Sequence, residues 1–321
     1  MTRLFILLFP LLTGSIAQKP IDDCIHIDEI SISSFSKFIV PSLDGKHKGE
    51  AGKVGVIGGS VEYTGAPYFA AISALKAGAD LVYVITTDSA APVIKTYSPD
   101  LIVYPYLHKE YRSVIHSLLP KMDVVVIGPG LGRENETLSL IYDIISTCKD
   151  LLKPLVIDAD GLYAISRNVS IIKDYPSPGV ILTPNHYEAE RLKISVSDDT
   201  SNWYRYWGDY VSILVKDSED QFHSNIPNLE WHVSGGGTGR RAGGQGDILS
   251  GILATLYNWS LKANLCVKYP VQVAQSLACY VASNLTRTCN FKAYLIYGRS
   301  MTASDMINKI HVAFEYILTR D

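Results

Sequence analysis

Short apolar segments alternate with segments of helical length from residue 53 to residue 257. The short segments are apolar throughout, which is typical of strands that are buried on both faces. Strands that alternate with helices favour a parallel sheet covered by helices. We therefore predict a three-layer α/β/α fold with a mostly parallel central sheet. The predicted strands are 53–57, 81–85, 101–104, 124–127, 155–157, 180–182 and 212–215.

Two of the predicted helices lie near the C-terminus and differ in character. Residues 271–285 are small or apolar on nearly every face, which indicates a buried helix. Residues 302–318 carry a single apolar stripe behind a capping-box pattern at Thr302 and Asp305. The other predicted helices are 67–77, 111–119, 137–148, 186–192 and 248–257.

The composition is that of a globular chain. Hydrophobic residues make up 47% and charged residues 19% of the 321 positions, which is enough apolar material for one large α/β domain. No linker, repeat or low-complexity tract appears from Lys53 onward. We therefore predict a single domain at 41–321 behind an N-terminal lead-in at 19–40. The net charge of −3 provides no basic surface for nucleic acid, so a polynucleotide partner is disfavoured.

Residues 1–18 have the three-part form of a secretory signal peptide. Arg3 precedes an apolar run at 4–12, and small residues at 15–17 end the segment. The run is too short to span a bilayer. The leader therefore favours entry into the ER and the secretory route. A mitochondrial presequence fits less well because it would be amphipathic and richer in arginine, and a cytoplasmic location stays open.

Four N-x-S/T sequons would be glycosylation acceptors on the secretory route. Those at Asn258 and Asn284 fall in or beside predicted buried helices, so we interpret them as chance occurrences. The other two are at Asn135 and Asn168.

The cysteines indicate neither a metal site nor a disulfide framework. They form no CxxC pair and no metal-ligand spacing with the histidines, and their odd number argues against a closed set of disulfides. We interpret them as buried or incidental thiols. They are Cys24, Cys148, Cys266, Cys279 and Cys289.

A glycine-rich stretch at 235–247 stands directly before the apolar run 248–257. Seven glycines in thirteen residues cannot form a core, but they let the backbone approach a ligand with its amide groups pointing inward. The run behind the stretch predicts a helix that begins at Asp247, and the N-terminus of that helix adds partial positive charge. This combination is typical of a binding site for an anion.

Charged residues in this stretch suggest phosphoryl transfer. Arg240 and Arg241 can neutralise phosphate oxygens, and Asp247 can accept the proton of a hydroxyl group that attacks a phosphoryl group. The structural alternative is a flexible linker in which Asp247 is an ordinary helix cap. We weigh this alternative lower, because a solvated linker would not need an apolar helix directly behind it.

Glycines and charged residues also follow four of the predicted strands. In a parallel sheet these turns share the edge at which ligands bind. Each turn has a structural alternative as a tight turn, a helix cap or a solvated strand end, so their clustering carries the argument. The turns are 128–133, 158–161 with Asp158 and Asp160, 183–188 and 216–220.

The turn after the first predicted strand does not support a nicotinamide dehydrogenase. The glycines of this strand and turn, Gly55, Gly58 and Gly59, do not match the G-x-G-x-x-G fingerprint. No acidic residue ends the second predicted strand, where the fingerprint requires one.

Taken in order, these motifs resemble the ATP-dependent NAD(P)H-hydrate dehydratases of the ribokinase-like superfamily, over roughly residues 40 to 318. The resemblance implies a ribokinase-like fold and ATP with Mg²⁺ as co-substrate and cofactor. It further implies repair of the 6S hydrates of NADH and NADPH, with ADP and phosphate as products. The motifs are GGSVEYTGAP at 58–67, GPGLGR at 128–133, DADGL at 158–162, TPNHYEAERL at 183–192, LVKDSED at 214–220 and GGQGD at 243–247.

The resemblance also implies roles for individual residues. Asp247 would be the catalytic base and would contact the hydrate, and Glu188 would act on magnesium through water. The other residues implied to meet the hydrate are Gly130, Asn185, His186, Tyr187, Glu188, Ala189, Glu190 and Arg191, with 64–67 as a further segment. Those implied to hold ATP are Lys216, Asp217, Ser218, Glu219, Asp220, Gly237, Thr238, Gly239, Arg240, Arg241, Ala242, Gly243, Gly244, Gln245 and Gly246.

Two positions depart from the superfamily pattern. Asp217 stands where many members have glycine, and Gln245 stands where the kinases usually have a small residue. The chain has no room for the epimerase domain that is fused in some bacterial members, so the resemblance implies a separate NAD(P)H-hydrate epimerase as functional partner. A homo-oligomer is compatible with the sequence.

Two alternative functions remain at this point. A kinase of the same superfamily would use the same Asp247 chemistry on a small hydroxymethyl or sugar substrate and release a stable phosphorylated product. A secreted nucleotide-binding protein without catalysis would account for the leader and the sequons.

Overall fold

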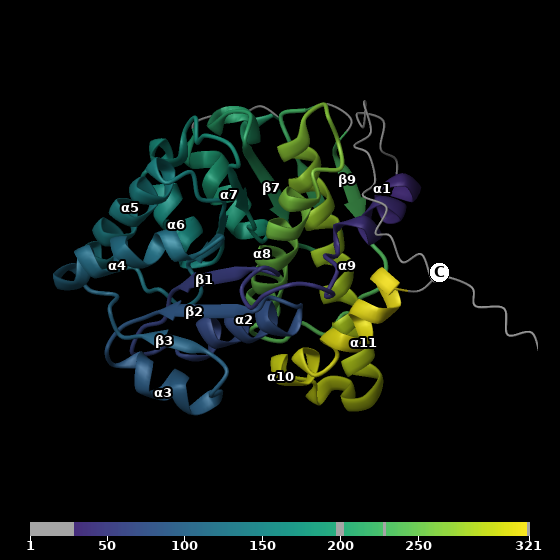
Figure 1. Cartoon of the computed structure of the whole chain (residues 1–321), viewed down its shortest axis with the longest axis horizontal. Helices are drawn as coiled ribbons and strands as arrows, with labels where there is room; N and C mark the ends of the chain where they lie inside the picture. Colours follow the sequence, from purple (N-terminus) through teal and green to yellow (C-terminus); the bar gives the residue numbers. More distant parts are fainter. Residues whose placement is uncertain (1–28, 197–201, 227–228, 320–321) are drawn as a thin grey trace, which may run out of the picture.

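The computed structural model describes residues 29–196, 202–226 and 229–319. The predicted leader at 1–18 and residues 19–28 of the lead-in lie outside these residues. Within them, one nine-stranded sheet has the order β3-β2-β1-β4-β5-β6-β7-β8-β9 (Figure 1). The first seven strands are parallel, and the last two add an antiparallel edge. The strands are β1 (Lys53–Ile57), β2 (Leu81–Ile85), β3 (Ile102–Tyr104), β4 (Val124–Ile127), β5 (Leu155–Ile157), β6 (Val180–Leu182), β7 (Val211–Val215), β8 (Asp220–His223) and β9 (Trp231–Val233).

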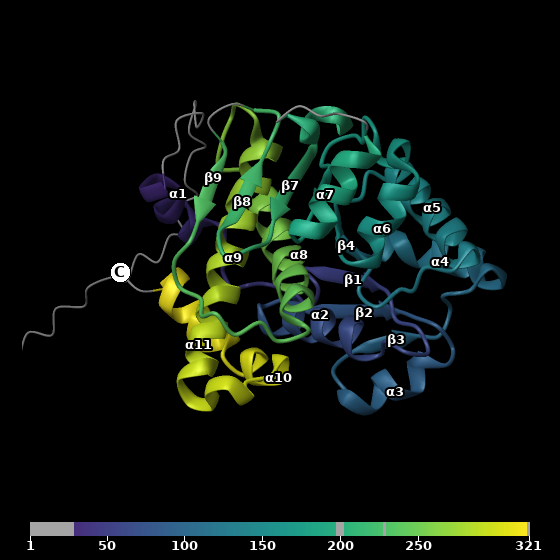
Figure 2. The same cartoon turned by 180° about the vertical axis from the view of Figure 1, so that it is seen from behind.

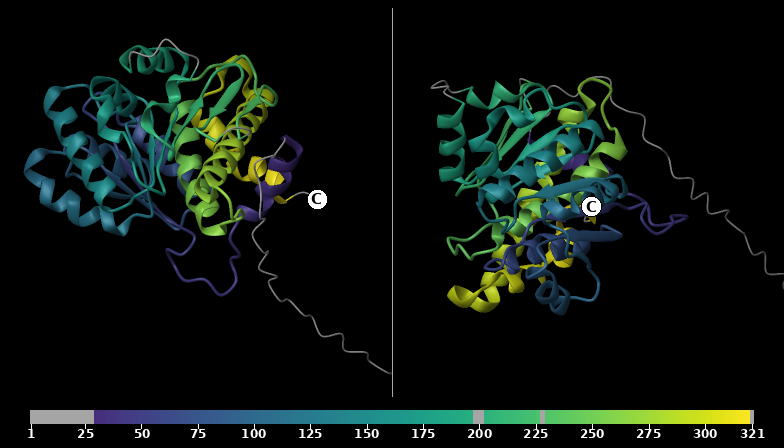
Figure 3. Two further views of the ribbon diagram at one scale, coloured as in Figure 1. Left: turned by 90° about the horizontal axis from the view of Figure 1, so that it is seen from above. Right: turned by 90° about the vertical axis from the view of Figure 1, so that its left-hand side faces the viewer.

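Helices cover both faces of the sheet, which lies between two helical layers (Figure 3). On one face they are α1 (Glu29–Ser36), α2 (Gly65–Lys76), α3 (Ala90–Tyr97), α8 (Gln245–Ala263), α9 (Pro270–Tyr297), α10 (Ala303–Ile307) and α11 (Ile310–Phe314). On the other face they are α4 (Arg112–Leu118), α5 (Asn135–Asp150), α6 (Asp160–Arg167) and α7 (His186–Ser195). The predicted three-layer arrangement is therefore confirmed.

The continuous apolar character of the strands follows from this arrangement. In β4, Val124 and Val126 face the core under α2 and α8, whereas Val125 and Ile127 face the core under α5. All four residues are fully buried. Successive side chains of a strand point to opposite faces, so a strand covered on both faces must be apolar at every position.

The predicted strand positions agree with β1 to β7 to within one residue, but the C-terminal prediction is wrong in one respect. The predicted helix 302–318 is broken between α10 and α11, at Asn308 and Lys309, and a π-helical turn follows at Glu315–Thr319. The capping box of Thr302 and Asp305 is present. The apolar stripe is continuous enough to predict one helix, but the break lets both short helices bury their faces against α2 and α9.

The sequence interpretation also missed several elements. Short helices α3 and α6 and the edge strands β8 and β9 lie in segments left without a prediction, and α9 extends twelve residues beyond the predicted end of its helix, from 285 to Tyr297. Figure 2 shows β8 and β9 at the edge of the sheet beside α9. In the described residues no helix is long and apolar enough to cross a membrane.

The predictions for the cysteines and for the sequon at Asn258 are confirmed only in part. Cys148, Cys279 and Cys289 are free and buried as expected, and burial raises the pKa of Cys148 and Cys289 to about 12. Cys266 is disulfide-bonded, so its interpretation as a thiol is wrong; an odd number of cysteines does not prevent one pair. Asn258 is only 4% exposed within α8, in agreement with its interpretation as a chance sequon.

Helix α8 is the central helix of its layer and contacts both α2 and α9. Gly251 lies where α8 crosses α2, and a Cβ atom at this position would overlap the carbonyl oxygen of Ala70. The close approach therefore requires glycine, and it fixes the height of α8 relative to the sheet.

We expect Gly251→Ala to lower the free energy of unfolding by about 1–3 kcal/mol, because the added methyl group must push two packed backbones apart. Urea unfolding measures the change. Gly65→Ala in α2 is the matched control, since a Cβ there would only contact the Phe69 ring at 3.6 Å. Equal stability of the two variants would contradict the steric argument.

Candidate active site

The turns after β5, β6 and β7 converge beneath the N-terminus of α8. Asn185 and Lys216 form a parallel bridge that continues the pairing of β6 with β7. A Cβ atom at Gly246 would lie 3.1 Å from Lys216 Nζ and 3.8 Å from Asp158 Oδ2. Three turns that are far apart in the sequence therefore meet at one point of the sheet edge, as expected for the carboxyl ends of parallel strands.

Glycines make this close approach of backbones possible. Gly128 has a φ angle of 127°, and a Cβ there would overlap the carbonyl oxygen of Asp158. Gly130 has a φ angle of 62°, and its Cβ would lie 2.7 Å from Tyr63 Cβ and 3.3 Å from Ala66 Cβ. The turn after β4 is thus held against both the 58–67 turn and the turn after β5.

An ion pair lies under the point of convergence. Lys216 Nζ is 2.6 Å from Asp158 Oδ1, and the two side chains are 17% and 2% exposed. Burial alone would lower the pKa of Lys216, but Asp158, Glu188 and Asp247 together hold that pKa above its usual value. Lys216 is therefore a permanent positive charge among three carboxylates.

Asp247 is the third residue of α8, after the left-handed Gly244 that precedes the helix. Burial and the negative charge of Asp158 raise the pKa of Asp247 to about 7, although Lys216 opposes the rise. A carboxyl group with this pKa is ionised for about half of the molecules at neutral pH, and it can both accept and return a proton.

Two clefts adjoin the first turn of α8. The glycine-loop cleft, of about 570 Å³, lies on the side of the glycine-rich stretch, and the Asp247 cleft, of about 600 Å³, lies on the side of the turn after β4. The glycine-loop cleft is lined by Asn185, His186, Tyr187, Lys216, Asp217, Asp220, Gly237, Arg241, Ala242, Gln245, Gly246, Leu249, Thr286, Arg287 and Asn290. The Asp247 cleft is lined by Glu62, Tyr63, Ala66, Gly130, Gly132, Arg133, Glu134, Ala159, Asp160 and Asp247.

The structure divides the residues that the sequence implied for the hydrate. Gly130, Asp247 and Ala66 line the Asp247 cleft. Asn185, His186 and Tyr187 instead line the glycine-loop cleft, together with most of the residues implied for ATP. Ala189 is buried and faces the core, whereas Arg191 and Arg133 both lie over the ring of Tyr163, at 5.7 and 4.8 Å from its centroid.

The two arginines of the glycine-rich stretch have different environments. Arg241 is exposed and lines the glycine-loop cleft. Arg240 donates hydrogen bonds to the carbonyl oxygens of Arg241 and Met301, so its guanidinium is fixed at the start of α10. Of the two, Arg241 is therefore placed to meet an anion in the cleft.

The two positions that depart from the superfamily pattern both hold loops in place. Gln245 Nε2 donates to the carbonyl oxygen of Arg240 at 3.0 Å. The Asp217 backbone N–H donates to Asp220 Oδ1 at 3.1 Å, and Asp217 Oδ1 accepts from the Ser218 N–H. Ser218 and Glu219 are exposed at the tip of this turn.

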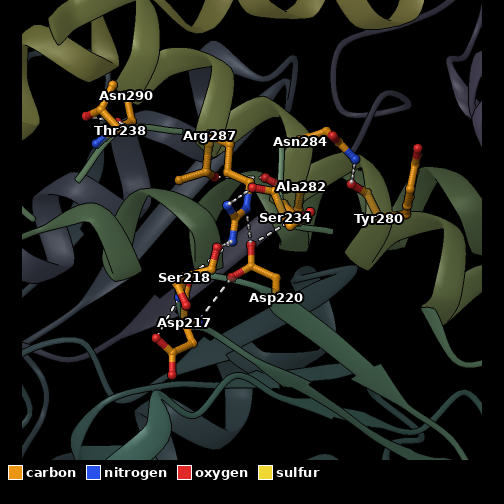
Figure 4. Close-up of polar contacts among 12 residues, drawn as sticks. Asp217, Ser218, Asp220, Ser234, Thr238, Tyr280, Ala282, Asn284, Arg287 and Asn290 are labelled. Carbon is orange, nitrogen blue, oxygen red and sulfur yellow. Dashed lines mark hydrogen bonds and ion pairs between the residues drawn. The ribbon is translucent and has the colours of Figure 1, made fainter. Parts of the chain in front are cut away.

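Helix α9 contributes cleft residues that the sequence interpretation missed. Thr286, Arg287 and Asn290 line the glycine-loop cleft, and all three lie beyond residue 285, where the predicted helix ended. Figure 4 shows Arg287 and Asn290 directed at the loops beside the cleft. The available signal was the three-residue spacing of Arg287 and Asn290, which places two polar side chains on the same side of a helix.

Glu188 and Asn185 form a capping box at the start of α7. The Asn185 side chain accepts from the Glu188 N–H, and Glu188 Oε2 accepts from the Asn185 N–H at 2.8 Å. Burial raises the pKa of Glu188 above its usual value, although the positive charge of Lys216 opposes the rise. The described residues contain no group of three or more His, Cys, Asp or Glu side chains that could hold a metal ion by themselves. The oxygens of Asn185 and Glu188 are of the kind that Mg²⁺ prefers, and Mg²⁺ held partly by a phosphate ligand uses only one or two protein carboxylates.

The chain resembles known proteins over most of its length. The family model described as NAD(P)H-hydrate dehydratase matches residues 54–311. An ATP-dependent (S)-NAD(P)H-hydrate dehydratase from Aedes aegypti is 47% identical over 281 residues, which cover 87% of this chain and 82% of the relative.

Solved structures show the same fold. A ribokinase-like superfamily protein from Enterococcus faecalis has a TM-score of 0.71 at 21% identity and covers 89% of this chain and 95% of its own. An ADP/ATP-dependent NAD(P)H-hydrate dehydratase from Bacillus subtilis, co-crystallized with ATP/Mg²⁺, has a TM-score of 0.63 at 19% identity. The match covers 89% of this chain and 97% of the Bacillus subtilis chain.

We expect Asp247→Asn to raise the free energy of unfolding at pH 8 by about 1–3 kcal/mol. The folded chain holds a proton on Asp247 up to about pH 7, whereas the unfolded chain releases it near the ordinary aspartate pKa of 3.8. The unfolding free energy of the wild type should therefore fall between about pH 4 and 7, and the variant should lack this part of the fall. Urea unfolding at several pH values tests it; parallel curves for the two proteins would contradict the raised pKa.

Proposed function

The chain belongs to the NAD(P)H-hydrate dehydratase family, and from this membership we infer that it uses ATP to dehydrate the hydrates of NADH and NADPH to the working coenzymes. We propose that the reaction takes place at the first turn of α8, where the two clefts meet. The observation that carries this placement is the position of Asp247 in one cleft and of its neighbour Gly246 in the other. ATP would occupy the glycine-loop cleft, and the hydrate would occupy the Asp247 cleft.

The first chemical step requires a base beside the hydrate hydroxyl. The hydroxyl oxygen attacks the γ-phosphorus of ATP, the bond from this phosphorus to the bridging oxygen breaks, and ADP leaves. Asp247 accepts the hydroxyl proton, for which a pKa of about 7 is suitable because the group is ionised in part and still basic. The hydroxyl, a poor leaving group, thereby becomes a phosphate ester.

The second step restores the ring. The ester's carbon–oxygen bond breaks and releases phosphate, and the neighbouring ring carbon loses a proton to form the double bond. The dihydronicotinamide of NADH or NADPH results, with water having been removed in the form of phosphate and protons. This outcome separates the dehydratase from a kinase of the same fold, whose phosphate ester would be stable.

Charge that develops on the transferred group needs donors that are already in place. Gly246 at the N-terminus of α8 leaves the backbone amides open to the cleft, and the helix dipole adds positive potential there. Arg241 supplies a full positive charge at the cleft wall. Lys216 lies deeper, paired with Asp158, and we propose that it mainly offsets the carboxylates around Asp247.

Magnesium would be held at the N-terminus of α7. Glu188 and Asn185 are the residues that we propose to bind it through water, since Mg²⁺ retains several waters and is held partly by substrate phosphates. When bound, the ion supplies positive charge to the phosphate oxygens.

Three further parts of the proposal concern the rest of the chain and its partners. We propose that residues 1–18 are a targeting leader, that 41–321 form one catalytic domain, and that a separate NAD(P)H-hydrate epimerase supplies the reactive epimer. The leader lies outside the described residues.

The direct test incubates the purified chain, without residues 1–18, with NADH hydrate, ATP and Mg²⁺. We expect the absorbance of the reduced nicotinamide to return and free phosphate to appear in equal amount. A stable phosphate ester without recovered absorbance would overturn the dehydratase assignment and favour a kinase.

We expect Asp247→Asn to lower kcat by about two to four orders of magnitude and to leave ATP binding intact, because it removes the general base but no ATP contact. Single-turnover kinetics and ATP titration measure the two effects. The exposed Asp44→Asn is the matched control for loss of one carboxylate. Unchanged turnover in Asp247→Asn would overturn the catalytic role.

The pH profile tests the same group independently. Asp247 must be ionised to accept a proton, so kcat/KM for the hydrate should rise with pH up to about 7 and then level off. Asp158→Asn removes a like charge from beside Asp247 and leaves Lys216 free to stabilise the ionised form. The rising limb should therefore move to lower pH in this variant, and a limb that does not move would contradict the electrostatic account.

A further inference from the structure

One face of α9 is directed at both loops that border the glycine-loop cleft. Ser283, Arg287 and Asn290 are spaced four and three residues apart, so their side chains lie on the same side of the helix. The loops come from different parts of the fold: 216–220 connects β7 to β8, and 234–244 connects β9 to α8. Figure 4 shows Arg287 between the two loops, with Asn290 one turn further along.

Arg287 uses most of its guanidinium to hold the 216–220 loop. Its Nε donates to Asp220 Oδ2 at 2.8 Å, and its Nη2 donates to the carbonyl oxygens of Asp217 and Ser218 at 3.1 and 3.0 Å. A weaker contact of 3.5 Å joins Nη1 to the carbonyl oxygen of Ser234 in the other loop. The planar fork of an arginine suits several acceptors in fixed directions, which a lysine could not serve at once.

Asn290 holds the glycine-rich loop in the same way. Its Oδ1 accepts from the Thr238 N–H and the Thr238 hydroxyl, at 2.8 and 2.7 Å. Its Nδ2 donates to the carbonyl oxygen of Arg240 at 3.0 Å. These contacts reach a stretch with little packing, because a Cβ at Gly235, Gly239 or Gly243 would meet no atom within 4 Å.

Arg287 also neutralises a carboxylate in the wall of the cleft. Asp220 lines the cleft, and its side chain is 7% exposed beside an Arg287 side chain that is 10% exposed. Without the arginine, this buried negative charge would face the polyphosphate that we assign to the cleft. The ion pair is thus placed to prevent repulsion as well as to fix the loop.

We propose that Arg287 and Asn290 are positioning residues that hold the two loops at the separation that ATP requires. The inference rests on the proposed function, because ATP is the ligand that we assign to the cleft. Four of the five N–H donors of Arg287 are directed at protein acceptors, so we assign it a positioning role rather than a phosphate contact. The pair therefore determines the KM for ATP, while kcat and the KM for the hydrate depend on the Asp247 cleft.

The test measures the KM for ATP, the KM for the hydrate and kcat in the full chain carrying Arg287→Gln or Arg287→Lys. Arg287→Gln should raise the KM for ATP about a hundredfold and Arg287→Lys about tenfold, since lysine restores the charge but not the fork. The hydrate KM, and kcat at saturating ATP, should stay within about twofold of wild type. Arg299→Gln, which removes the same charge from an exposed position, is the matched control and should change nothing.

The double variant Asp220→Asn with Arg287→Gln separates the two contributions. The double variant lacks the unpaired Asp220 carboxylate, but it still lacks the hydrogen bonds of Arg287 to the 216–220 loop. The KM for ATP should therefore recover only in part. Full recovery in the double variant or wild-type affinity in Arg287→Lys would overturn the positioning role and leave charge neutralisation alone. A parallel loss in kcat and in both KM values, with a lower Tm, would show a general structural role and would also overturn it.

Asn290→Asp provides a second variant in case Arg287 variants do not fold. It keeps the acceptor for Thr238, loses the donor to Arg240 and adds a negative charge at the cleft, and we expect about a tenfold higher KM for ATP. Asn284→Ala on the same helix is its control, because among the described residues the Asn284 amide donates to the Tyr280 carbonyl oxygen of its own helix and not to a loop at the cleft. Unchanged ATP affinity in Asn290→Asp would overturn the role of Asn290.

Calorimetry with a non-hydrolysable ATP analogue keeps the inference separate from the proposed reaction. Wild-type chain that binds the analogue but does not dehydrate the hydrate would refute the proposed function and leave the inference testable. Binding that is equal in wild type and Arg287→Gln would refute the inference even if the dehydratase activity is present.

Discussion

The ion pair between Lys216 and Asp158 joins the carboxyl ends of two strands beneath the N-terminus of α8. Both side chains are largely removed from water, so each depends on the other to offset the cost of its desolvation. Removing one partner of such a pair usually costs about 3–5 kcal/mol, because the remaining charge is left buried. The turns that form the site are thus locked together by the same contact that sets its charge.

This pair explains why several carboxylates can lie close together at one edge of the sheet. Asp158, Glu188 and Asp247 all raise the pKa of Lys216, and Asp158 also raises the pKa of Glu188 and of Asp247. One lysine cannot neutralise three acids, so burial and the excess negative charge together favour a proton on Asp247. Ionisation of this residue is therefore disfavoured by its surroundings, which keeps it basic enough to accept a proton near neutral pH.

The glycine-rich loop presents a different physical problem. Its glycines allow close approach to a ligand but provide few packing contacts to hold the loop in one conformation. The structure meets this need with side-chain hydrogen bonds from outside the loop, namely from Asn290 of α9 and from Gln245 at the start of α8. Backbone freedom and a defined binding geometry are compatible because the restraint comes from a rigid helix.

The sequence by itself determined the positions of β1 to β7 along the chain and the parallel sheet, and it drew attention to the stretch around Asp247, because apolar periodicity and glycine content are local properties of the chain. Only the tertiary structure decided which turns share a cleft, that Arg240 is turned toward Met301 while Arg241 faces the cleft, and that α9 reaches both loops. These facts depend on contacts between residues that are distant in sequence. A pKa near 7 at Asp247 likewise arises from burial and from Asp158, neither of which any local pattern contains.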